Sequence, residues 1–87
     1  MNIVYVLKSL HDGKLYIGST RKTGVARLKV HNSGSVRSTK GRRPFELIYT
    51  ERFGSYTDAR KRENYFKTSI GRAELKRLML FNKKLDV

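Results

Sequence analysis

Two strand-like runs joined by a turn dipeptide constrain the fold of this chain more than any other feature. Residues 3–7 (Ile-Val-Tyr-Val-Leu) and 15–20 (Leu-Tyr-Ile-Gly-Ser-Thr) are rich in the β-branched and aromatic residues typical of strands. Between them lie Asp12 and Gly13, a pair that favours positive φ and a tight turn. The first twenty residues therefore predict an antiparallel hairpin.

The expected register places two tyrosines on one face of this hairpin. A two-residue turn pairs Ser9 with Tyr16 and Tyr5 with Thr20. Because side chains alternate with a period of two, Tyr5 and Tyr16 then share a face, and a slip of one residue would separate them. Gly18 lies on the same face without a side chain, so we expect an open patch beside the phenols that a backbone or a ligand can approach.

The charge balance favours a polyanionic partner but does not name it, because a ribosomal protein, a chromatin-like binder or a membrane-surface protein would show the same balance. The chain carries 20 Lys and Arg against 7 Asp and Glu, a formal charge of +13 on 87 residues. Such a field attracts polyanions, of which nucleic acid is the commonest in a cell. The chain has no cysteine, no apolar run of the roughly 18 residues that span a membrane and no signal-peptide pattern. We expect a soluble cytoplasmic protein without membrane contact, as a monomer or weak dimer.

The remaining sequence predicts three helices and one more strand. Helices are expected over 24–32, over 56–68 and over 72–81, with Thr23 and Ser55 as the first two N-caps. Val25 and Leu28 give the first of these helices a modest apolar stripe.

The additional strand, 45–51, would complete a three-stranded antiparallel sheet. The residues expected on one face of this strand are Phe45, Leu47 and Tyr49. We predict an α/β (α+β) domain over 1–82, with the sheet flanked by about three helices, and a frayed tail over 83–87.

Chemically useful side chains lie on the first two helices. Arg27 and His31 are four residues apart on one face. Glu63 interrupts an apolar stripe that is expected to face the sheet, and an inward carboxylate needs a cation to offset its desolvation. That cation is either Lys67, one turn later, or a hard divalent metal such as Mg²⁺. The apolar members of the stripe are Ala59, Phe66 and Ile70.

Residues 33–44 form a basic loop by composition. Such a loop is either simply solvated or grips phosphates with its cations, hydroxyls and amides. The side chains available for the second role are those of Arg37, Ser38, Thr39, Lys40, Arg42 and Arg43.

These motifs resemble the GIY-YIG nuclease family. Residues 16–18 (Tyr-Ile-Gly) are the second half of its motif, and residues 3–5 (Ile-Val-Tyr) keep the tyrosine of the first half without its glycine. The family places an arginine and a histidine on the first helix and a metal-binding glutamate on the second. Arg27, His31 and Glu63 match these positions.

The resemblance is to a particular branch. The string 39–44 (Thr-Lys-Gly-Arg-Arg-Pro) is similar to the loop of the small stand-alone bacterial members, and the whole is similar to the nuclease domain of the excinuclease C subunit without its other domains. Ser19 stands where the excision-repair branch tends to carry lysine, and Leu78 where many members carry asparagine. The DNA-reading domains of other branches are absent, so low sequence specificity is expected.

The resemblance implies a metal-dependent endonuclease that hydrolyses phosphodiester bonds of nucleic acid, with DNA favoured over RNA. A structure-selective role in DNA repair or recombination is one such function. The cofactor would be Mg²⁺ or Mn²⁺ held by Glu63, and no small-molecule cofactor is expected. Arg27 would neutralise charge on the phosphoryl oxygens.

The roles of the two tyrosines are not fixed by the sequence. We favour Tyr16 for activating water, with Tyr5 and His31 positioning it or relaying its proton, but exchanged tyrosine roles stay open. The residues expected to contact nucleic acid are Gly18, Arg37, Thr39, Lys40, Arg42 and Arg43. The alternative is a non-catalytic nucleic-acid-binding module, which explains the charge but not an inward carboxylate that repels phosphate.

Overall fold

Three antiparallel strands form the centre of the structure, a computed structural model that describes residues 1–85 and the side chains of residues 1–81. The strands are β1 (Asn2–Ser9), β2 (Leu15–Thr20) and β3 (Phe45–Phe53), in the order β2-β1-β3. The predicted three-stranded antiparallel sheet is therefore confirmed, with β1 in the middle and β2 at an edge.

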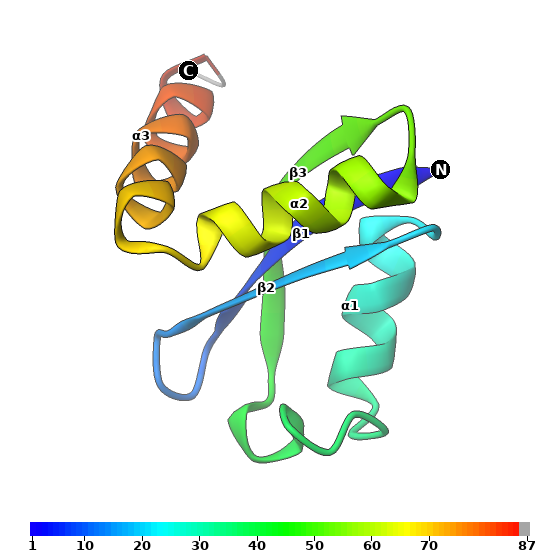
Figure 1. Cartoon of the computed structure of the whole chain (residues 1–87). Helices are drawn as coiled ribbons and strands as arrows, with labels where there is room; N and C mark the ends of the chain where they lie inside the picture. Colours follow the sequence, from blue (N-terminus) through cyan, green and yellow to red (C-terminus); the bar gives the residue numbers. More distant parts are fainter. Residues whose placement is uncertain (86–87) are drawn as a thin grey trace.

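Helices cover both faces of this sheet (Figure 1). One face packs against α1 (Gly24–Asn32), and the other packs against α2 (Tyr56–Phe66), which α3 (Ser69–Leu85) follows. A short 3-10 helix, η1 (Lys40–Arg42), lies in the loop before β3. None of the helices described over 1–85 has the length and apolar character needed to cross a bilayer.

The hairpin register differs from the expected one by two residues. Tyr5 pairs with Gly18 rather than with Thr20. The turn is longer than two residues: the amide of Ser9 donates to the carbonyl of Lys14, 2.9 Å away, and the Ser9 hydroxyl accepts from two amides inside the turn. A shift of two preserves the alternation of side chains, so Tyr5 still lies on the face expected for it.

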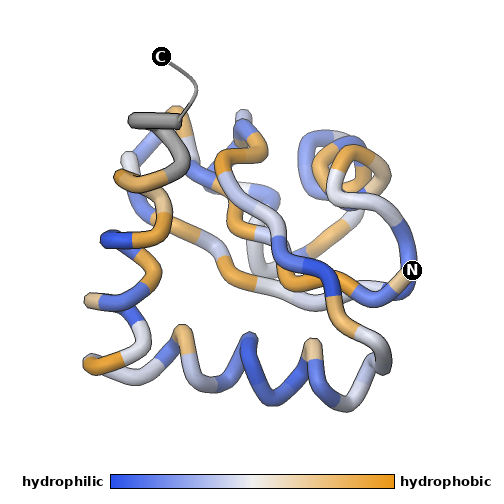
Figure 2. The backbone as a smooth tube through the Cα atoms, turned by 90° about the horizontal axis from the view of Figure 1, so that it is seen from above, coloured by the Kyte–Doolittle hydropathy of each residue, from blue (hydrophilic) through white to orange (hydrophobic). Residues whose placement is uncertain are grey.

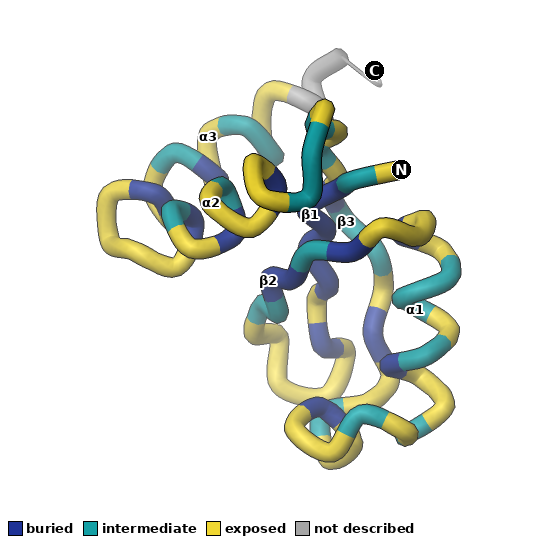
Figure 3. The backbone as a smooth tube through the Cα atoms, turned by 45° about the vertical axis from the view of Figure 1, so that its right-hand side comes forward, coloured by how far each residue is buried: buried dark blue, intermediate teal, exposed yellow. Residues whose placement is uncertain are grey.

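The central strand β1 is buried along most of its length (Figure 3), and apolar residues are frequent in the strands (Figure 2). Its side chains divide between two small cores, one on each face of the sheet. The core on the α1 face contains Ile3, Tyr5, Leu7 and Phe45. The core on the α2 face contains Val4, Val6, Ile17, Tyr49, Ala59, Phe66 and Leu75. Burial on both faces explains the nearly continuous apolar run of β1.

A β-bulge changes the face of β3 partway along the strand. The register shifts opposite residues 6–7, so that Ile48 is inserted between Leu47 and Tyr49 in the pairing with β1. Phe45 and Leu47 pack on the α1 face, whereas Tyr49 packs on the α2 face. The prediction that these three residues share one face is therefore wrong, because an inserted residue reverses the alternation.

The two predicted N-caps are present, but two apolar residues that were expected to be buried are exposed. The side chains of Thr23 and Ser55 each accept an amide hydrogen bond at the start of α1 and α2. Val25, expected to pack inward, is 55% exposed, and Ile70 is 75% exposed because α2 ends before reaching it. The buried positions of α1 are instead Gly24 and His31.

The last two helices have other boundaries than expected. α2 ends at Phe66, two residues early, and α3 begins at Ser69 rather than at residue 72. Residues 83–85, expected in the frayed tail, belong to α3. Residues 86–87 of that predicted tail lie outside the described part of the chain.

Gly71→Ala should destabilise the fold, because Gly71 packs against the end of α2. A Cβ atom there would lie 1.8 Å from the carbonyl oxygen of Tyr65, so the backbone must shift. Such overpacking costs about 1–3 kcal/mol, whereas alanine in an unobstructed helix would stabilise it. Urea unfolding measures the difference. Gly54→Ala is the control, since nothing lies within 4 Å of its added Cβ. Equal stability of the two variants would contradict the close contact.

Candidate active site

Four of the five predicted catalytic residues meet on the α1 face of the sheet. Tyr5 comes from β1, Tyr16 from β2, and Arg27 and His31 from α1. The Tyr5 hydroxyl lies 3.1 Å from His31 Nε2 and accepts from Arg27 Nε at 3.3 Å. The Tyr16 ring packs on the His31 ring, with 4.6 Å between centroids. The shared strand face and the four-residue helical spacing together produce this cluster.

A directed chain of hydrogen bonds fixes the tautomer of His31. The hydroxyl of Thr39 donates to the carbonyl of Val36 at 3.4 Å, and its oxygen lies 2.9 Å from His31 Nδ1. Nδ1 is therefore the protonated nitrogen, and its hydrogen goes to Thr39. Nε2 is left as the acceptor for the Tyr5 hydroxyl. The Tyr5 hydroxyl thus donates to neutral His31 and accepts from Arg27.

Burial keeps both members of this pair uncharged. Tyr5 is 1% exposed and His31 is 0% exposed. Burial raises the pKa of Tyr5 above its ordinary value, although the hydrogen bond from Arg27 opposes the change. Burial, followed by the positive charge of Arg27, lowers the pKa of His31. Tyr16 and Arg27 are only half-buried and are the accessible members of the cluster.

Gly18 does not leave the open patch that we expected. A Cβ atom on Gly18 would lie 2.5 Å from the Tyr5 hydroxyl, because the phenol of Tyr5 crosses the strand at this point. Tyr5 is the direct partner of Gly18 in the observed register, so its own side chain fills the gap. The missing side chain of Gly18 therefore makes room for the Tyr5 ring. Gly18 is buried, so a direct contact with nucleic acid is not open to its Cα.

Glu63 lies on the other face of the sheet, on α2. Its carboxylate accepts from the Ser19 hydroxyl at 2.5 Å and from Lys67 Nζ at 2.6 Å, and Arg60 Nε is 3.8 Å away. Burial alone would raise the pKa of Glu63, but its hydrogen bonds with Lys67 and Ser19 and the nearby charges lower it overall. Glu63 is therefore a buried, negatively charged group. The predicted ion pair with Lys67 is present.

The two faces meet at the β2 edge of the sheet. Ser19, which binds Glu63, directly follows Gly18, over which the Tyr5 hydroxyl lies. Because neighbouring residues of a strand point to opposite faces, the tyrosine cluster and Glu63 are one residue apart along β2 but on opposite sides. They are not on one concave surface, as a single-face site would require. A ligand that touches both must lie along the exposed edge of β2.

The basic loop divides into structural and exposed side chains. Arg42 Nε forms an ion pair with Asp12 at 3.1 Å, and the Arg42 carbonyl accepts from Ser9, so this arginine ties the loop to the hairpin. Thr39 is fully buried against His31 and cannot reach a bound nucleic acid. The exposed basic side chains of the loop are those of Arg37, Lys40 and Arg43, and the Ser38 hydroxyl is exposed beside them.

Sequence reasoning missed the roles of Ser19 and Thr39. The strand period alone turns Ser19 away from Gly18 and towards the α2 face, so its contact with a helix on that face had a signal in the sequence. Thr39 had no such signal, because the loop that carries it has no periodicity. Its contact with His31 depends on how the loop folds back under α1.

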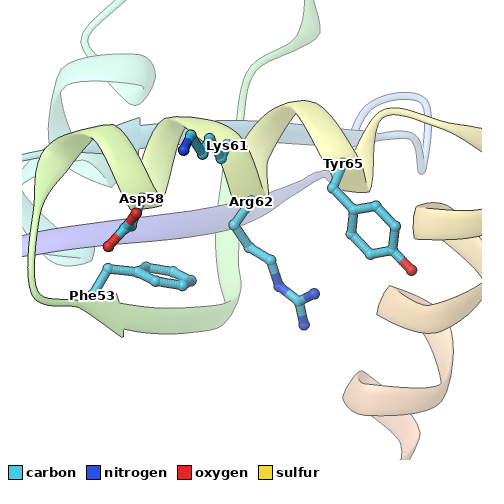
Figure 4. Close-up of a pocket in the computed structure, with 5 residues that line it drawn as sticks. All are labelled: Phe53, Asp58, Lys61, Arg62 and Tyr65. Atoms are coloured by element: carbon cyan, nitrogen blue, oxygen red, sulfur yellow. The ribbon is translucent and has the colours of Figure 1, made fainter.

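A separate hollow opens on the outer side of α2 (Figure 4). None of the predicted catalytic residues lines it. Arg62 in this hollow pairs with Glu51 at 2.9 Å and with Glu74 at 2.8 Å, which ties α2 to β3 and α3. The lining residues are Phe53, Asp58, Lys61, Arg62 and Tyr65.

Comparison with known families gives a match that covers most of the chain. Residues 1–76 match the GIY-YIG catalytic domain. The chain belongs to the GIY-YIG family. This match includes both half-motifs, α1 and the part of α2 that carries Glu63, and it confirms the resemblance derived from the sequence.

Several relatives in the GIY-YIG family are named UPF0213 proteins. The chain is 36% identical over 75 residues to the one from Staphylococcus epidermidis, covering 86% of this chain and 90% of that protein. It is 43% identical over 77 residues to the one from Natronomonas pharaonis, covering 87% of each. The solution structure of the UPF0213 protein from Bacillus halodurans superimposes with a TM-score of 0.53 at 34% identity, over 88% of this chain and 83% of that one. The Bacillus halodurans protein shares the fold, and the match to the GIY-YIG catalytic domain supports a nuclease-like function.

A metal in this GIY-YIG domain would depend on Glu63. Within the described residues, no group of three His, Cys, Asp or Glu side chains gathers around one point. Mg²⁺ commonly binds one or two carboxylates and completes its shell with waters and substrate phosphates. Glu63 offers one hard anionic donor at the β2 edge, and the exposed Lys67 that neutralises it can move aside. The donor set fits a metal shared with the substrate.

His31→Gln should reduce the pH dependence of stability. The pKa of His31 is lowered in the folded state, so below about pH 6.5 the unfolded chain binds more protons and stability falls as the pH drops. Asp12 and Glu63, whose pKa values are also lowered, change the pH dependence of stability only below about pH 4.5. Urea unfolding at pH 7.5 and 5.5 should show a larger loss for the wild type than for the variant. His11→Gln, an exposed histidine, is the control, and equal losses in all three proteins would contradict a buried neutral His31.

Proposed function

We propose that this protein is a metal-dependent endonuclease that hydrolyses phosphodiester bonds in nucleic acid. The observation that carries the proposal is the hydrogen-bonded cluster of Tyr5, His31 and Arg27, which lies across the edge strand β2 from Glu63. The match to the GIY-YIG catalytic domain supports the same class of chemistry. A binding surface alone has no need for a buried tyrosine-histidine pair or for an ionised carboxylate.

Tyr16 is the better candidate for activating water. A general base must reach the water, and Tyr16 is half-buried whereas Tyr5 is 1% exposed. Burial raises the pKa of Tyr5, and the neighbouring Tyr16 raises it further, so ionisation of one phenol opposes ionisation of the other. We assign Tyr5 to positioning: its hydroxyl orients Arg27 and can pass a proton to Nε2 of His31.

Arg27 is assigned to the phosphoryl oxygens. Its Nε donates to Tyr5 and its Nη2 lies 3.5 Å from His31 Nε2. A guanidinium carries five N–H donors, so donors remain for a substrate phosphate. The two buried neighbours hold the guanidinium in place before the substrate binds, and a fixed cation stabilises the charge that develops in the transition state.

Glu63 is assigned to the metal, Mg²⁺ or Mn²⁺. A bound divalent ion polarises the phosphate and stabilises the leaving oxygen. Ser19 holds one carboxylate oxygen, and Lys67 neutralises the other until a metal or substrate replaces it. The metal and the Arg27 guanidinium would then lie on opposite sides of the β2 edge, with the substrate strand along that edge.

The substrate we propose is DNA in the cytoplasm, bound with low sequence specificity. The charge of +13 favours contacts with phosphates, which carry no base information. The hollow lined by Phe53, Arg62 and Tyr65 lies away from the β2 edge, so it is not placed to select a base there. A strand whose phosphates are exposed, as at a branch or a single-stranded gap, fits an edge better than a closed groove, so structure-selective cleavage in repair or recombination is the role we favour.

The second candidate is a non-catalytic nucleic-acid-binding module. It is favoured by one observation: Glu63 is already satisfied by Ser19 and Lys67, so the structure needs no metal to explain this buried charge. In this case Glu63 would simply join α2 to β2. The substitution Glu63→Gln separates the two candidate functions.

Glu63→Gln should abolish metal-dependent cleavage and leave binding intact or slightly tighter. Glutamine keeps the shape of the side chain but holds a hard cation poorly, and it removes a charge that repels phosphate. The measurements are cleavage of a plasmid and of branched oligonucleotides with Mg²⁺ or Mn²⁺, and equilibrium binding at the same salt.

Glu74→Gln is the matched control for this experiment, since Glu74 pairs with Arg62 away from the cluster. It should cleave like the wild type. Wild-type cleavage by Glu63→Gln, or a wild type that cleaves nothing on the whole panel, would replace the nuclease hypothesis with the binding module.

Binding should depend on the exposed cations of the loop. Each duplex phosphate contact contributes about 0.9 to the slope of log K against log salt, so Arg37→Ala with Lys40→Ala should flatten the slope by about one to two units. Arg42→Ala should change the slope less, because Asp12 already neutralises that guanidinium. A salt titration by fluorescence anisotropy measures both. An unchanged slope for the double variant would remove the loop from the binding surface.

A further inference from the structure

A second cationic cluster lies on the α2 side of the β2 edge, beyond the residues assigned above. The guanidinium of Arg21 lies 4.1 Å above the ring of Tyr56, close enough for a cation–π contact. Arg60, one turn along α2 from Tyr56, has its Nε 3.8 Å from the Glu63 carboxylate. Arg21 directly follows β2 and Tyr56 begins α2, so the cluster joins two elements at the same end of the sheet.

The phenol of Tyr56 links the two arginines to the edge of the sheet. Its pKa is lowered, first by Ser19 and then by Arg60, which lie close to the phenol. Ser19 also donates to Glu63, so the phenol and the carboxylate lie near the same residue. The Tyr56 ring holds the Arg21 guanidinium on its face. Arg21 is therefore positioned by a neutral aromatic group, whereas Arg60 also faces the Glu63 carboxylate.

The charges of this cluster do not balance. Arg60 and Lys67 both contact the Glu63 carboxylate, and Arg21 adds a third cation over the neighbouring Tyr56 ring, so these four residues carry a surplus of two positive charges. Arg21 and Arg60 are exposed, and 3.8 Å is a long contact for an ion pair. A structural role would be better served by a close pair, such as the 2.9 Å contact of Arg62 with Glu51 on the other side of α2. The surplus suits an anionic ligand.

We propose that Arg21, Tyr56 and Arg60 form a second phosphate-binding site, which holds the backbone of the bound strand next to the phosphate that is cleaved. This inference rests on the proposed function. The ligand is a nucleic-acid phosphodiester, which two guanidinium groups can bind through paired N–H donors. Arg27 lies on one face of the sheet and this site on the other. The bound nucleic-acid strand would therefore cross the edge of the sheet at β2, next to Glu63.

The test is equilibrium binding of a fluorescent single-stranded oligonucleotide in EDTA, over a range of salt. Arg21→Ala with Arg60→Ala should lower the slope of log K against log salt by about 1.4 units, about 0.7 for each contact on a single strand. The charge-matched control is Arg52→Ala with Arg72→Ala, two exposed arginines on β3 and α3. This control should keep the wild-type slope. Equal slopes for the two double variants would overturn the site.

Two variants of Tyr56 separate a positioning role from general charge. Tyr56→Phe keeps the ring beneath Arg21 but loses the hydroxyl that lies near Ser19 and Arg60, whereas Tyr56→Ala loses both the ring and the hydroxyl. Neither substitution changes the net charge at neutral pH, so a site organised by Tyr56 predicts weaker binding for alanine than for phenylalanine, and weaker for both than for the wild type. Wild-type affinity of both variants would contradict that organisation.

The binding measurements in EDTA do not require cleavage. If Glu63→Gln abolishes cleavage but the Arg21 and Arg60 variants bind normally, the nuclease hypothesis stands and the second site is wrong. If no cleavage is found but these variants bind weakly, the phosphate site stands and the protein is a binding module.

Discussion

The phenol of Tyr5 lies buried in the middle of the sheet, and a buried hydroxyl must be hydrogen-bonded. Its partners are His31 and Arg27, both on α1, so this one group fixes how the helix sits on the sheet. The same ring crosses β2 at Gly18, where no side chain could fit. A change at Tyr5 would therefore alter helix packing, strand pairing and the cluster together.

His31 connects the hydrogen-bonded cluster around Tyr5 to the basic loop. Its Nδ1 is held by Thr39, and the same loop is joined to the hairpin through Arg42 and Asp12. The loop thus has two anchors that are structural, and its exposed cations project from a fixed base. Protonation of Nε2 would remove its capacity to accept from Tyr5, whereas the contact of Nδ1 with Thr39 does not depend on that nitrogen.

The edge position of β2 decides what chemistry the domain can perform. A strand in the middle of the sheet would separate the tyrosine cluster from Glu63 by a full layer of buried side chains. At an edge, the two groups lie on either side of one strand, joined through Gly18 and Ser19. This arrangement suits the extended, charged substrate that we propose. It also brings the proposed catalytic groups together from four elements, β1, β2, α1 and α2.

The sequence by itself determined the local features of this protein. Strand alternation placed Tyr5 and Tyr16 on one face, helical spacing placed Arg27 beside His31, and the caps placed the starts of α1 and α2, because each depends on neighbours within a few residues. The hairpin register, the bulge at Ile48, the burial of Thr39 and the face on which Glu63 lies were decided by the tertiary structure. These depend on the length of a turn, on an inserted residue and on which side of the sheet each helix packs, and no local pattern encodes the competition between such packings.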